Sequence, residues 1–466
     1  MIKDELYTML DTISQTKYID KRLISLFIIG FFIAIIIDTS LVRIYDLVSK
    51  NVISPNFKLL VFSVNTSLCL LFQIGILFYL SRIFKQDRFK NSVLIFKKYH
   101  YIALISVLAM AILISSVIFN LFDQSMYNKY QMMFSIILCY SSAIFFFIVL
   151  GKLFYSWYKG NHKYLIFLYL LSVILITFNL VATMTITVLK IHDKPEKIRE
   201  YVGITSFSKL GKYAVLDTIY TISSILSFVS LWITTFILVT TYRKKSLRNI
   251  IFLMVLLLPL IYFGTNYVIK YYITDIFDSF AIVGPFILSV SLIVVFSLSY
   301  PIGGITFGLL FWRTSKAVSY EKDVVGFILI AGYGIMLVFS ANQATSLIST
   351  PYPPFGLSTI SILTIAAYMT LLGIYNSAKM VSINNELRRS IVKITLESRM
   401  LNLMGEAEKQ KEVETIIMRI HGDSAISEIE NDVKQGPDLD QDELRKYIYD
   451  VINELHHENQ EGKFTE

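Results

Sequence analysis

Several side chains that could bind a polar ligand interrupt the long apolar stretches of this sequence. They comprise two carboxylates, one ammonium group and three amides, and they are Asp38, Asp217, Asn266, Lys270, Asn342 and Gln343. Under the topology that the loop charges predict, these groups lie in or near the outer halves of their stretches and could converge in a wet vestibule for a small polar ligand. Alternatively, they are ordinary polar residues near a membrane surface, where water and headgroups satisfy them. The sequence leaves both interpretations open.

The motifs of common enzyme classes are missing from the sequence. It contains no Walker loop, HExxH motif, nucleophile elbow or kinase signature. The six histidines show no convincing ligand spacing, and Cys69 and Cys139 are too few for a thiolate zinc site or a disulfide framework. Asp38 and Asp46 lie where a polyprenyl-phosphate glycosyltransferase carries acidic residues, but the loop there is shorter than such enzymes usually need. We therefore predict that the protein is not an enzyme and has no catalytic residues, metal site or cofactor.

The composition predicts a membrane protein. Apolar residues make up 55% of the chain and charged residues 17%, whereas soluble domains have about 45–50% and about 25%. A helix of about 20 apolar residues crosses the hydrocarbon layer of a bilayer. We expect an all-α, polytopic membrane helix bundle of about ten transmembrane helices, at 22–42, 58–81, 101–122, 131–154, 164–189, 214–241, 249–271, 279–299, 324–347 and 357–379.

The charges divide the chain into a basic membrane part and an acidic tail. Residues 1–379 hold 32 Lys and Arg against 16 Asp and Glu, whereas residues 380–466 hold 11 against 19. Cytoplasmic loops of membrane proteins carry an excess of Lys and Arg. This excess falls in alternate loops, with 190–213 as the exception, and predicts that both ends lie in the cytoplasm. The acidic tail argues against a nucleic-acid surface, and the basic charge suits loops near anionic lipid.

One apolar stretch, residues 279–312, is too long for a single span. Proline and glycine between Tyr300 and Gly304 indicate a break within it. We expect a span that ends at Ser299 and then a short interfacial or re-entrant helix from 302 to about 318. Two full spans are the alternative, but they would place the tail outside, against the charge rule.

The sequence predicts three parts: a cytoplasmic N-terminal segment (1–21), a ten-helix transmembrane domain (22–379) and an acidic, helical cytoplasmic tail (380–466). Apolar residues at helical spacing predict a first tail helix from Ser382 to about Met404 and shorter amphipathic helices beyond it. The tail has too little apolar surface for an independent core. We therefore expect it to bind a cytoplasmic protein partner.

The loop at 349–356 contains three prolines and two aromatic residues. Proline fixes φ and removes a hydrogen-bond donor, so the loop should be stiff and close to the membrane surface. It is either a rigid connector or a lid over a site at Asn342 and Gln343.

Three short segments carry a resemblance. They are Tyr-Pro-Pro-Phe-Gly-Leu at 352–357, Gly-Ile-Tyr at 373–375 and Leu-Arg-Arg-Ser-Ile at 387–391. Together they resemble a group of uncharacterised multi-pass membrane proteins of ammonia-oxidising archaea. The resemblance covers about 40 residues and implies an archaeal cell-membrane location. It implies no activity and no functional residues.

Two functions remain compatible with the sequence. One is a membrane sensor or signalling scaffold, in which the last span continues into the tail and transmits a change caused by an outside ligand. The other is a secondary transporter or permease for a small polar solute, which the number of spans and the break near 301–304 allow. The lack of a charged residue near the midplane of any span favours the sensor.

Overall fold

The structure is a computed structural model that describes part of the chain. The described residues are 21–47, 55–84, 94–124, 126–199, 213–240, 304–309, 311–312, 315, 322–342, 352–383, 401, 403–411 and 413. The chain divides into two compact units, Met1–Glu406 and Ala407–Glu466. In the second unit, the described residues 407–411 and 413 are helical.

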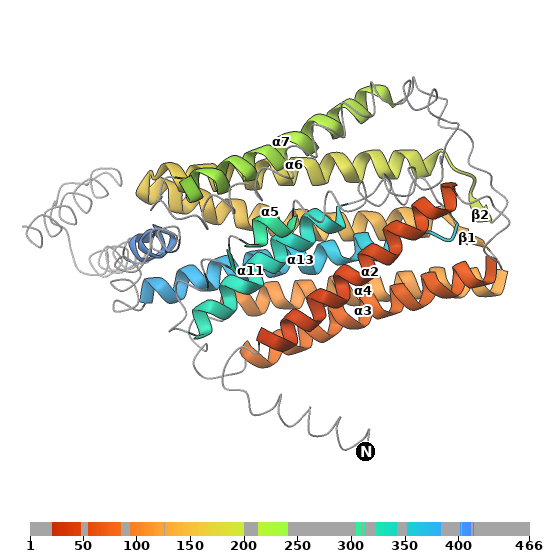
Figure 1. The fold of residues 1–466 in the computed structure, drawn as a ribbon, viewed down its shortest axis with the longest axis horizontal. Helices are drawn as coiled ribbons and strands as arrows, with labels where there is room; N and C mark the ends of the chain where they lie inside the picture. The colour runs from red at the N-terminus through yellow and green to blue at the C-terminus, as the bar shows by residue number, and fades with distance from the viewer. Residues whose placement is uncertain are drawn as a thin grey trace, which may run out of the picture. The chain divides into compact units, whose positions relative to one another are not determined.

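The described part of the first unit is almost entirely helical, and its long helices run side by side roughly along one direction (Figure 1). They are α2 (Lys21–Leu47), α3 (Pro55–Phe84), α4 (Leu94–Gln124), α5 (Lys129–Asn161), α6 (Tyr164–His192), α7 (Ala214–Thr240), α11 (Lys322–Ala341) and α13 (Leu357–Ile383). Within the described residues, seven helices are long and apolar enough to cross a bilayer, and α2 contains a shorter apolar stretch. These helices indicate a membrane-embedded, multi-pass protein.

Eight of the ten predicted spans coincide with these helices. The other two, 249–271 and 279–299, lie outside the described residues, so the count of ten stays a prediction.

Proline at the first position of α3 suits a helix start, because the N–H that it lacks would have no partner there. The α5 helix begins at Lys129, where the Asn128 side chain accepts a hydrogen bond from the Tyr130 amide (2.8 Å).

A small sheet was not predicted. Strands β1 (Met126–Asn128) and β2 (Lys197–Arg199) pair antiparallel, with Met126 opposite Arg199. Lys129, next to β1, donates hydrogen bonds to the carbonyl oxygens of His192 (2.9 Å) and Lys194 (3.0 Å), at and just past the end of α6. This cation therefore satisfies carbonyl groups that the helix end leaves free. The end of the bundle that contains β1 and β2 is called the sheet end below.

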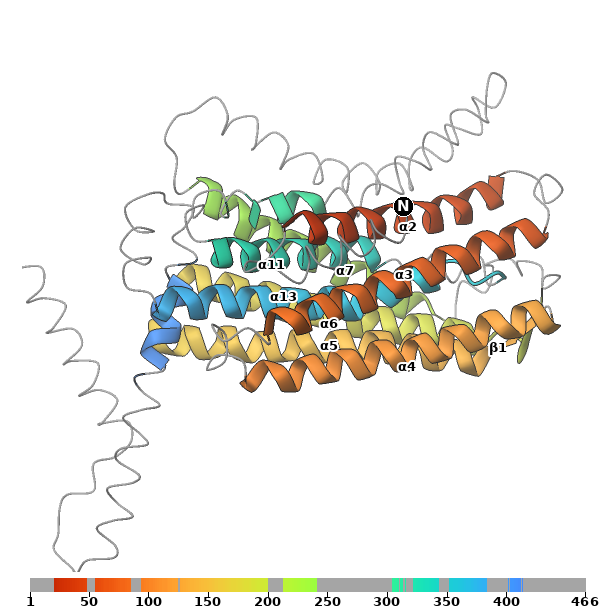
Figure 2. The ribbon, with the colours of Figure 1, turned by 90° about the horizontal axis from the view of Figure 1, so that it is seen from below.

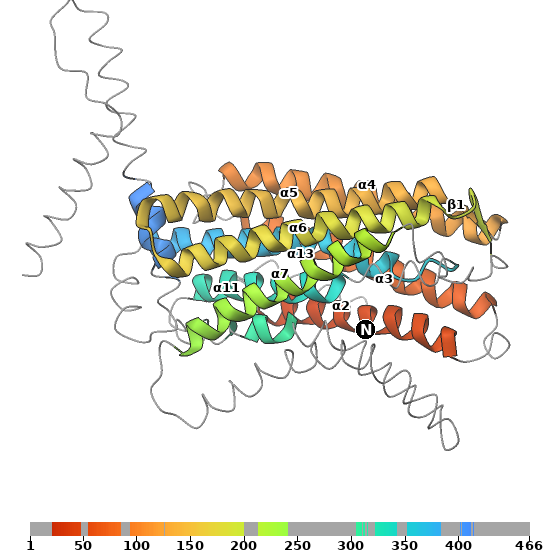
Figure 3. The same cartoon turned by 90° about the horizontal axis from the view of Figure 1, so that it is seen from above.

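Helix α13 lies in the centre of the bundle. It packs against α2, α3, α4, α5 and α11, and Figures 2 and 3 show it between α2 and α11 on one side and α4 and α5 on the other. Almost all of its side chains are buried. Helix α4 instead exposes large apolar side chains such as Ile105 (65%) and Ile112 (71%), which suits contact with lipid.

Two glycines let α11 and α13 approach closely. A methyl group built on Gly373 would lie 2.5 Å from the carbonyl oxygen of Phe327 and 2.7 Å from the Cα of Ala331. A methyl group on Gly334 would lie 2.5 Å from the amide nitrogen of Thr370. Small residues of this kind allow backbone-to-backbone packing between membrane helices, where dispersion forces rather than hydrophobic burial drive association.

The segment after the predicted break is helical at 304–309 and 311–312. Gly304 and Gly308 pack closely against Met336 and Gly332 around the middle of α11, and the Phe307 ring lies 5.1 Å from the Phe339 ring. The prediction of a helix here is confirmed over these residues. Its contact with the middle of α11 favours the re-entrant alternative over the interfacial one, and the choice between them stays a prediction.

The predicted tail, 380–466, is described in part. Helix α13 runs to Ile383, and residues 401 and 403–406 of the same unit are helical. A methyl group on Gly405 would lie 2.5 Å from a side-chain methyl of Val381. The start of this second helical segment therefore packs directly on the end of α13 that is farther from the sheet.

Candidate functional site

The first group of predicted site residues forms around Asp38, which is fully buried in α2. Its Oδ2 atom accepts hydrogen bonds from the Gly356 amide (2.8 Å), the Thr359 hydroxyl (2.5 Å) and the Thr359 amide (3.3 Å). These donors lie at the start of α13, in Gly356 just before the helix and in Thr359 of its first turn, where backbone N–H groups lack partners within their own helix. Asp38 therefore caps α13 from a neighbouring helix, and the positive end of the helix dipole favours its charge.

Two side chains of α3 extend this contact to α13. The Asn65 amide donates to the Ala34 carbonyl (3.1 Å) and the Ser358 hydroxyl (3.5 Å). Farther along, the Gln73 amide donates to the Ser361 hydroxyl (2.9 Å). Gly356, just before α13, has a φ of 93°, which a side chain would strain, so glycine is needed where the chain turns onto Asp38. The beginning of α13 is thus held by both α2 and α3.

The second group is a chain of hydrogen bonds through Asn342, the residue directly after α11. The Tyr140 hydroxyl donates to Asn342 Oδ1 (3.1 Å), and Asn342 Nδ2 donates to Asn179 Oδ1 (2.7 Å). The Asn179 amide then donates to the Ser223 hydroxyl (3.1 Å). The chain links α5, α11, α6 and α7. Each amide nitrogen keeps a second N–H beyond the bond named here, so the chain could also hydrogen-bond a ligand.

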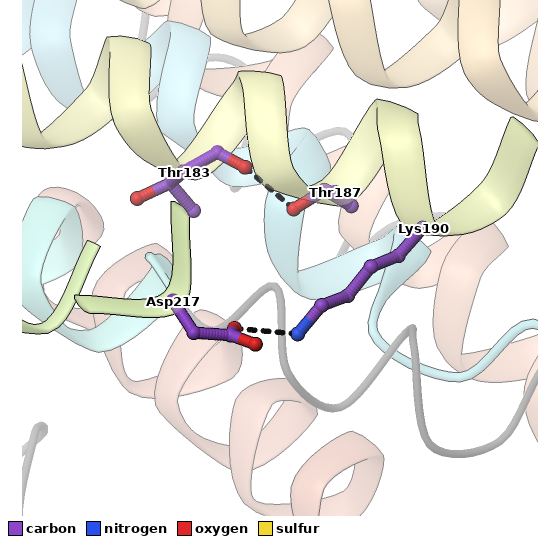
Figure 4. Close-up of polar contacts among 4 residues, drawn as sticks. All are labelled: Thr183, Thr187, Lys190 and Asp217. Carbon is purple, nitrogen blue, oxygen red and sulfur yellow. Dashed lines mark hydrogen bonds and ion pairs between the residues drawn. The ribbon is translucent and has the colours of Figure 1, made fainter. Parts of the chain in front are cut away.

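The third group is an ion pair between α6 and α7 (Figure 4). The Lys190 ammonium lies 2.6 Å from a carboxylate oxygen of Asp217, and one turn earlier the Thr187 hydroxyl donates to the Thr183 carbonyl (2.6 Å). The Asp217 side chain is 50% exposed and that of Lys190 is 20% exposed. Asp217 already has a partner of opposite charge, so it is a weaker candidate for ligand binding than its charge suggested.

Removing this ion pair should have a small effect. We expect Asp217→Asn to lower the free energy of unfolding by less than about 1 kcal/mol, because ion pairs near solvent are weak. The measurement is thermal unfolding in detergent at low and at high salt, and salt should shrink the difference between variant and wild type. A large loss that salt does not change would instead assign Asp217 a buried structural role.

The remaining predicted residues, Asn266, Lys270 and Gln343, lie outside the described residues. The proline-rich loop is described at 352–356. Its Phe355 ring packs edge-to-face on Phe62 of α3 (5.8 Å). Burial raises the pKa of the Tyr127 phenol in β1 well above its usual range, and the nearby Tyr352 phenol adds to the shift. The described part of the loop therefore lies against α3 and near β1, while its role as a lid over Asn342 stays a prediction.

A small, partly open cavity, with room for little more than a water molecule, lies among α5, α6, α7, α11 and α13. Its walls are mostly apolar and include Phe147, Val173, Ile335 and Phe339. Two lining hydroxyl groups bond to carbonyls of their own helices: Ser172 to Leu168 (2.9 Å) and Thr370 to Ala366 (2.9 Å). The cavity therefore offers no polar surface to an ion or a polar solute.

Comparison of the chain with models of protein families, with curated proteins and with solved structures finds no match. The site must therefore be judged by its own geometry. Among the described residues, no group of three His, Cys, Asp or Glu side chains is placed to hold a metal ion.

The sequence did not reveal the residues that hydrogen-bond to the predicted site residues. The expected depth of each polar residue in its span singled out Asp38 and Asn342, but it did not single out Thr359, Tyr140 or Ser223. Hydroxyl residues are common in membrane helices, so their presence alone carries little signal. The cavity residues were missed because an apolar wall has the same composition as a lipid-facing surface.

Proposed function

We propose that the protein is a membrane sensor or signalling scaffold in which α13 transmits a ligand-dependent change to the tail. The observation that carries this proposal is the position of α13: it is buried in the bundle, held by Asp38 at the sheet end, and packed at Val381 against the start of the next helical segment. In this proposal the chain has ten spans in a cell membrane, the sheet end faces outward, and the acidic tail binds a cytoplasmic protein.

Signalling of this kind requires two states of the bundle that differ in ligand affinity. The contacts of Asp38 with Gly356 and Thr359 form the natural point of control, because they hold the first turn of α13 from outside that helix. The close α11–α13 interface is suited to small sliding movements of packed helices. A ligand that favours one arrangement would shift α13 and with it the segment that rests on Val381.

The alternative is a secondary transporter for a small polar solute. The hydrogen-bonded chain from Tyr140 through Asn342 and Asn179 to Ser223 favours it, since polar groups of four helices meet in the bundle. Deletion of residues 400–466 separates the two functions. Uptake of a panel of solutes into reconstituted vesicles that survives this deletion would support the transporter.

Weakening the Asp38 contact should release the tail segment. Met404 is 1% exposed, so a cysteine at this position should react slowly with a maleimide in the resting protein. With Cys69 and Cys139 replaced by alanine, we expect Asp38→Asn to raise the labelling rate of Met404→Cys about 5-fold or more, the lower end of typical coupling between sites. The measurement is the labelling rate in nanodiscs, followed by mass shift.

Two controls make this test specific. Gln131→Ala removes a hydrogen bond between α4 and α5 (to Asn120, 3.1 Å) and should leave the labelling rate unchanged. Ile198→Ala removes a buried side chain of β2 at the sheet end and should lower the stability of the protein. Its labelling rate shows how much lower stability alone changes the exposure of position 404. An equal increase in all three variants, or none with Asp38→Asn, would contradict coupling through α13.

A further inference from the structure

One face of α5 changes from apolar to cationic along its length. Its exposed residues follow one another at spacings of three and four, which places them on one side of the helix. They are Phe134, Ile137, Ser141, Phe145, Ile148, Lys152, Tyr155 and Lys159. Helices α4 and α5 form one outer side of the bundle (Figures 2 and 3), so this exposed face of α5 is suited to contact with lipid.

The length of the apolar part matches the hydrocarbon layer of a bilayer. About 35 Å of helix separates Lys129 from Lys152 at 1.5 Å per residue, and the hydrocarbon layer is about 30 Å thick. Tyr130 (52% exposed) lies at one end of this stretch and Tyr155 (60% exposed) at the other. Tyrosine and lysine are typical of the level of the headgroups. Lys152, Tyr155 and Lys159 therefore lie where phospholipid headgroups are expected.

The helices around this cluster offer its cations no counter-charge. Among the described helices, α5 packs against α4, α6 and α13. Neither α5 nor α6 nor α13 contains an Asp or Glu residue, and the only one in α4 is Asp123, close to the sheet end. Lys152 and Lys159 are both exposed. Their positive charge is thus available to an anion from outside these helices.

The two lysines differ in what their own helix gives them. Lys159 belongs to the last turn of α5, where free carbonyl groups and the helix dipole favour a cation. Lys152 lies nine positions before the end of the helix, about 13 Å along its axis, and has no such support. A lysine at this depth can extend its long side chain toward the headgroups and bind a phosphate there.

We propose that Lys152, Tyr155 and Lys159 bind the headgroup of an anionic phospholipid. The lipid phosphate accepts charge-assisted hydrogen bonds from the two ammonium groups and a hydrogen bond from the phenol, while the acyl chains lie along Phe145 and Ile148. A lipid fits this place better than an acidic protein segment. The cluster continues the lipid-facing side of α5, where lipid is already present.

This site goes beyond the proposed function. It requires that α5 spans a bilayer, but not that α13 transmits a signal. In the proposed orientation the sheet end faces outward, so the cluster faces the cytoplasm, where anionic lipids give the membrane surface a negative potential. Lipid binding at α5 and the labelling of a cysteine at position 404 are separate measurements, so each can fail while the other succeeds.

The first experiment measures lipid affinity by native mass spectrometry of the full-length protein in a neutral detergent. Phosphatidylglycerol should bind more tightly than phosphatidylcholine, whose headgroup carries its own cation. Lys152→Gln should weaken phosphatidylglycerol binding about 5-fold, and the double variant with Lys159→Gln about 25-fold, as expected for lysines near an anionic surface. Lys152→Arg should retain the affinity. Thermal unfolding shows that each variant is folded.

Lys197→Gln is the matched control, because it removes an exposed lysine of β2 at the sheet end. It should leave lipid affinity unchanged. Equal affinity for the two lipids, or an equal loss with Lys197→Gln, would overturn the site. Glycerol 3-phosphate should not compete at the same concentration, and competition by it would show that the cluster binds soluble phosphate instead of lipid.

The second experiment locates the lipid. Phosphatidylglycerol with a photoactivatable diazirine in its headgroup is added to the protein in nanodiscs, and cross-linked peptides are identified by mass spectrometry. We expect cross-links in the peptide that contains Tyr155, and we expect the double lysine variant to lose them. Cross-links confined to other peptides would overturn the assignment to α5.

Discussion

Gly373→Ala should destabilise the protein by about 1–3 kcal/mol, and Gly373→Leu should prevent correct assembly of the bundle. The added methyl group would lie 2.5 Å from the Phe327 carbonyl oxygen and 2.7 Å from the Ala331 Cα, both in the backbone of α11. Backbone atoms cannot rotate away as a side chain can, so the two helices must separate. Overpacking of a close interface typically costs about 1–3 kcal/mol, and a larger side chain costs more.

Gly151 provides a matched control in α5. A methyl group there would lie 3.6 Å from a Val173 side-chain carbon, which is an ordinary van der Waals contact. Gly151→Ala should therefore be neutral or slightly stabilising, since alanine is the better helix former. The measurement is thermal unfolding in detergent together with the fraction of monodisperse protein on size exclusion. Equal stability of Gly373→Ala and Gly151→Ala would show that α11 and α13 do not pack as described.

Asp38→Ala should lower the free energy of unfolding by about 2–5 kcal/mol. The substitution leaves the Gly356 amide and both the amide and the hydroxyl of Thr359 without their acceptor in a buried place. A buried donor that loses its partner costs about 1–3 kcal/mol, and loss of a helix cap typically costs about 1 kcal/mol. Asp38→Asn keeps an acceptor oxygen and should lose clearly less stability than Asp38→Ala.

Asp123 is the control for this substitution. It lies exposed near the end of α4, and Asp123→Ala should change stability by no more than about 0.5 kcal/mol. Chemical unfolding followed by tryptophan fluorescence would compare the three variants. If Asp38→Ala were as stable as Asp123→Ala, the carboxylate would not act as a cap, and its burial would need a different explanation.

The helices of this protein could be predicted because one property controls them. A helix that crosses a bilayer must be apolar over about 20 residues, and hydropathy along the chain shows this directly. The expected span at 214–241 and the observed Ala214–Thr240 nearly coincide. The span expected at 324–347 is longer than α11, which ends at Ala341, so Asn342 follows the helix instead of lying within it.

The arrangement of the site could not be predicted in the same way. Hydropathy gives the depth of a residue, but it does not show which helix faces it. Asp38 meets Thr359 more than 300 residues later in the chain, and Tyr140 meets Asn342 about 200 residues later. These contacts depend on the order of helices around α13. The glycines at positions 334 and 373 were visible in the sequence, yet only the packed structure shows that they face a neighbouring backbone.

Helix α13 leaves the ribosome after α2, α3, α4, α5 and α11, the helices that surround it in the bundle. During translation, α2 to α5 and α11 must therefore enter the bilayer before the segment that fills the space among them exists. Until then, lipid or the insertion machinery has to cover Asp38, Asn65 and Gln73, each of which hydrogen-bonds to α13 or to Gly356 just before it. Completion of the bundle is thus tied to the end of synthesis of its membrane part, and a chain that stops before residue 357 would expose these polar groups to lipid.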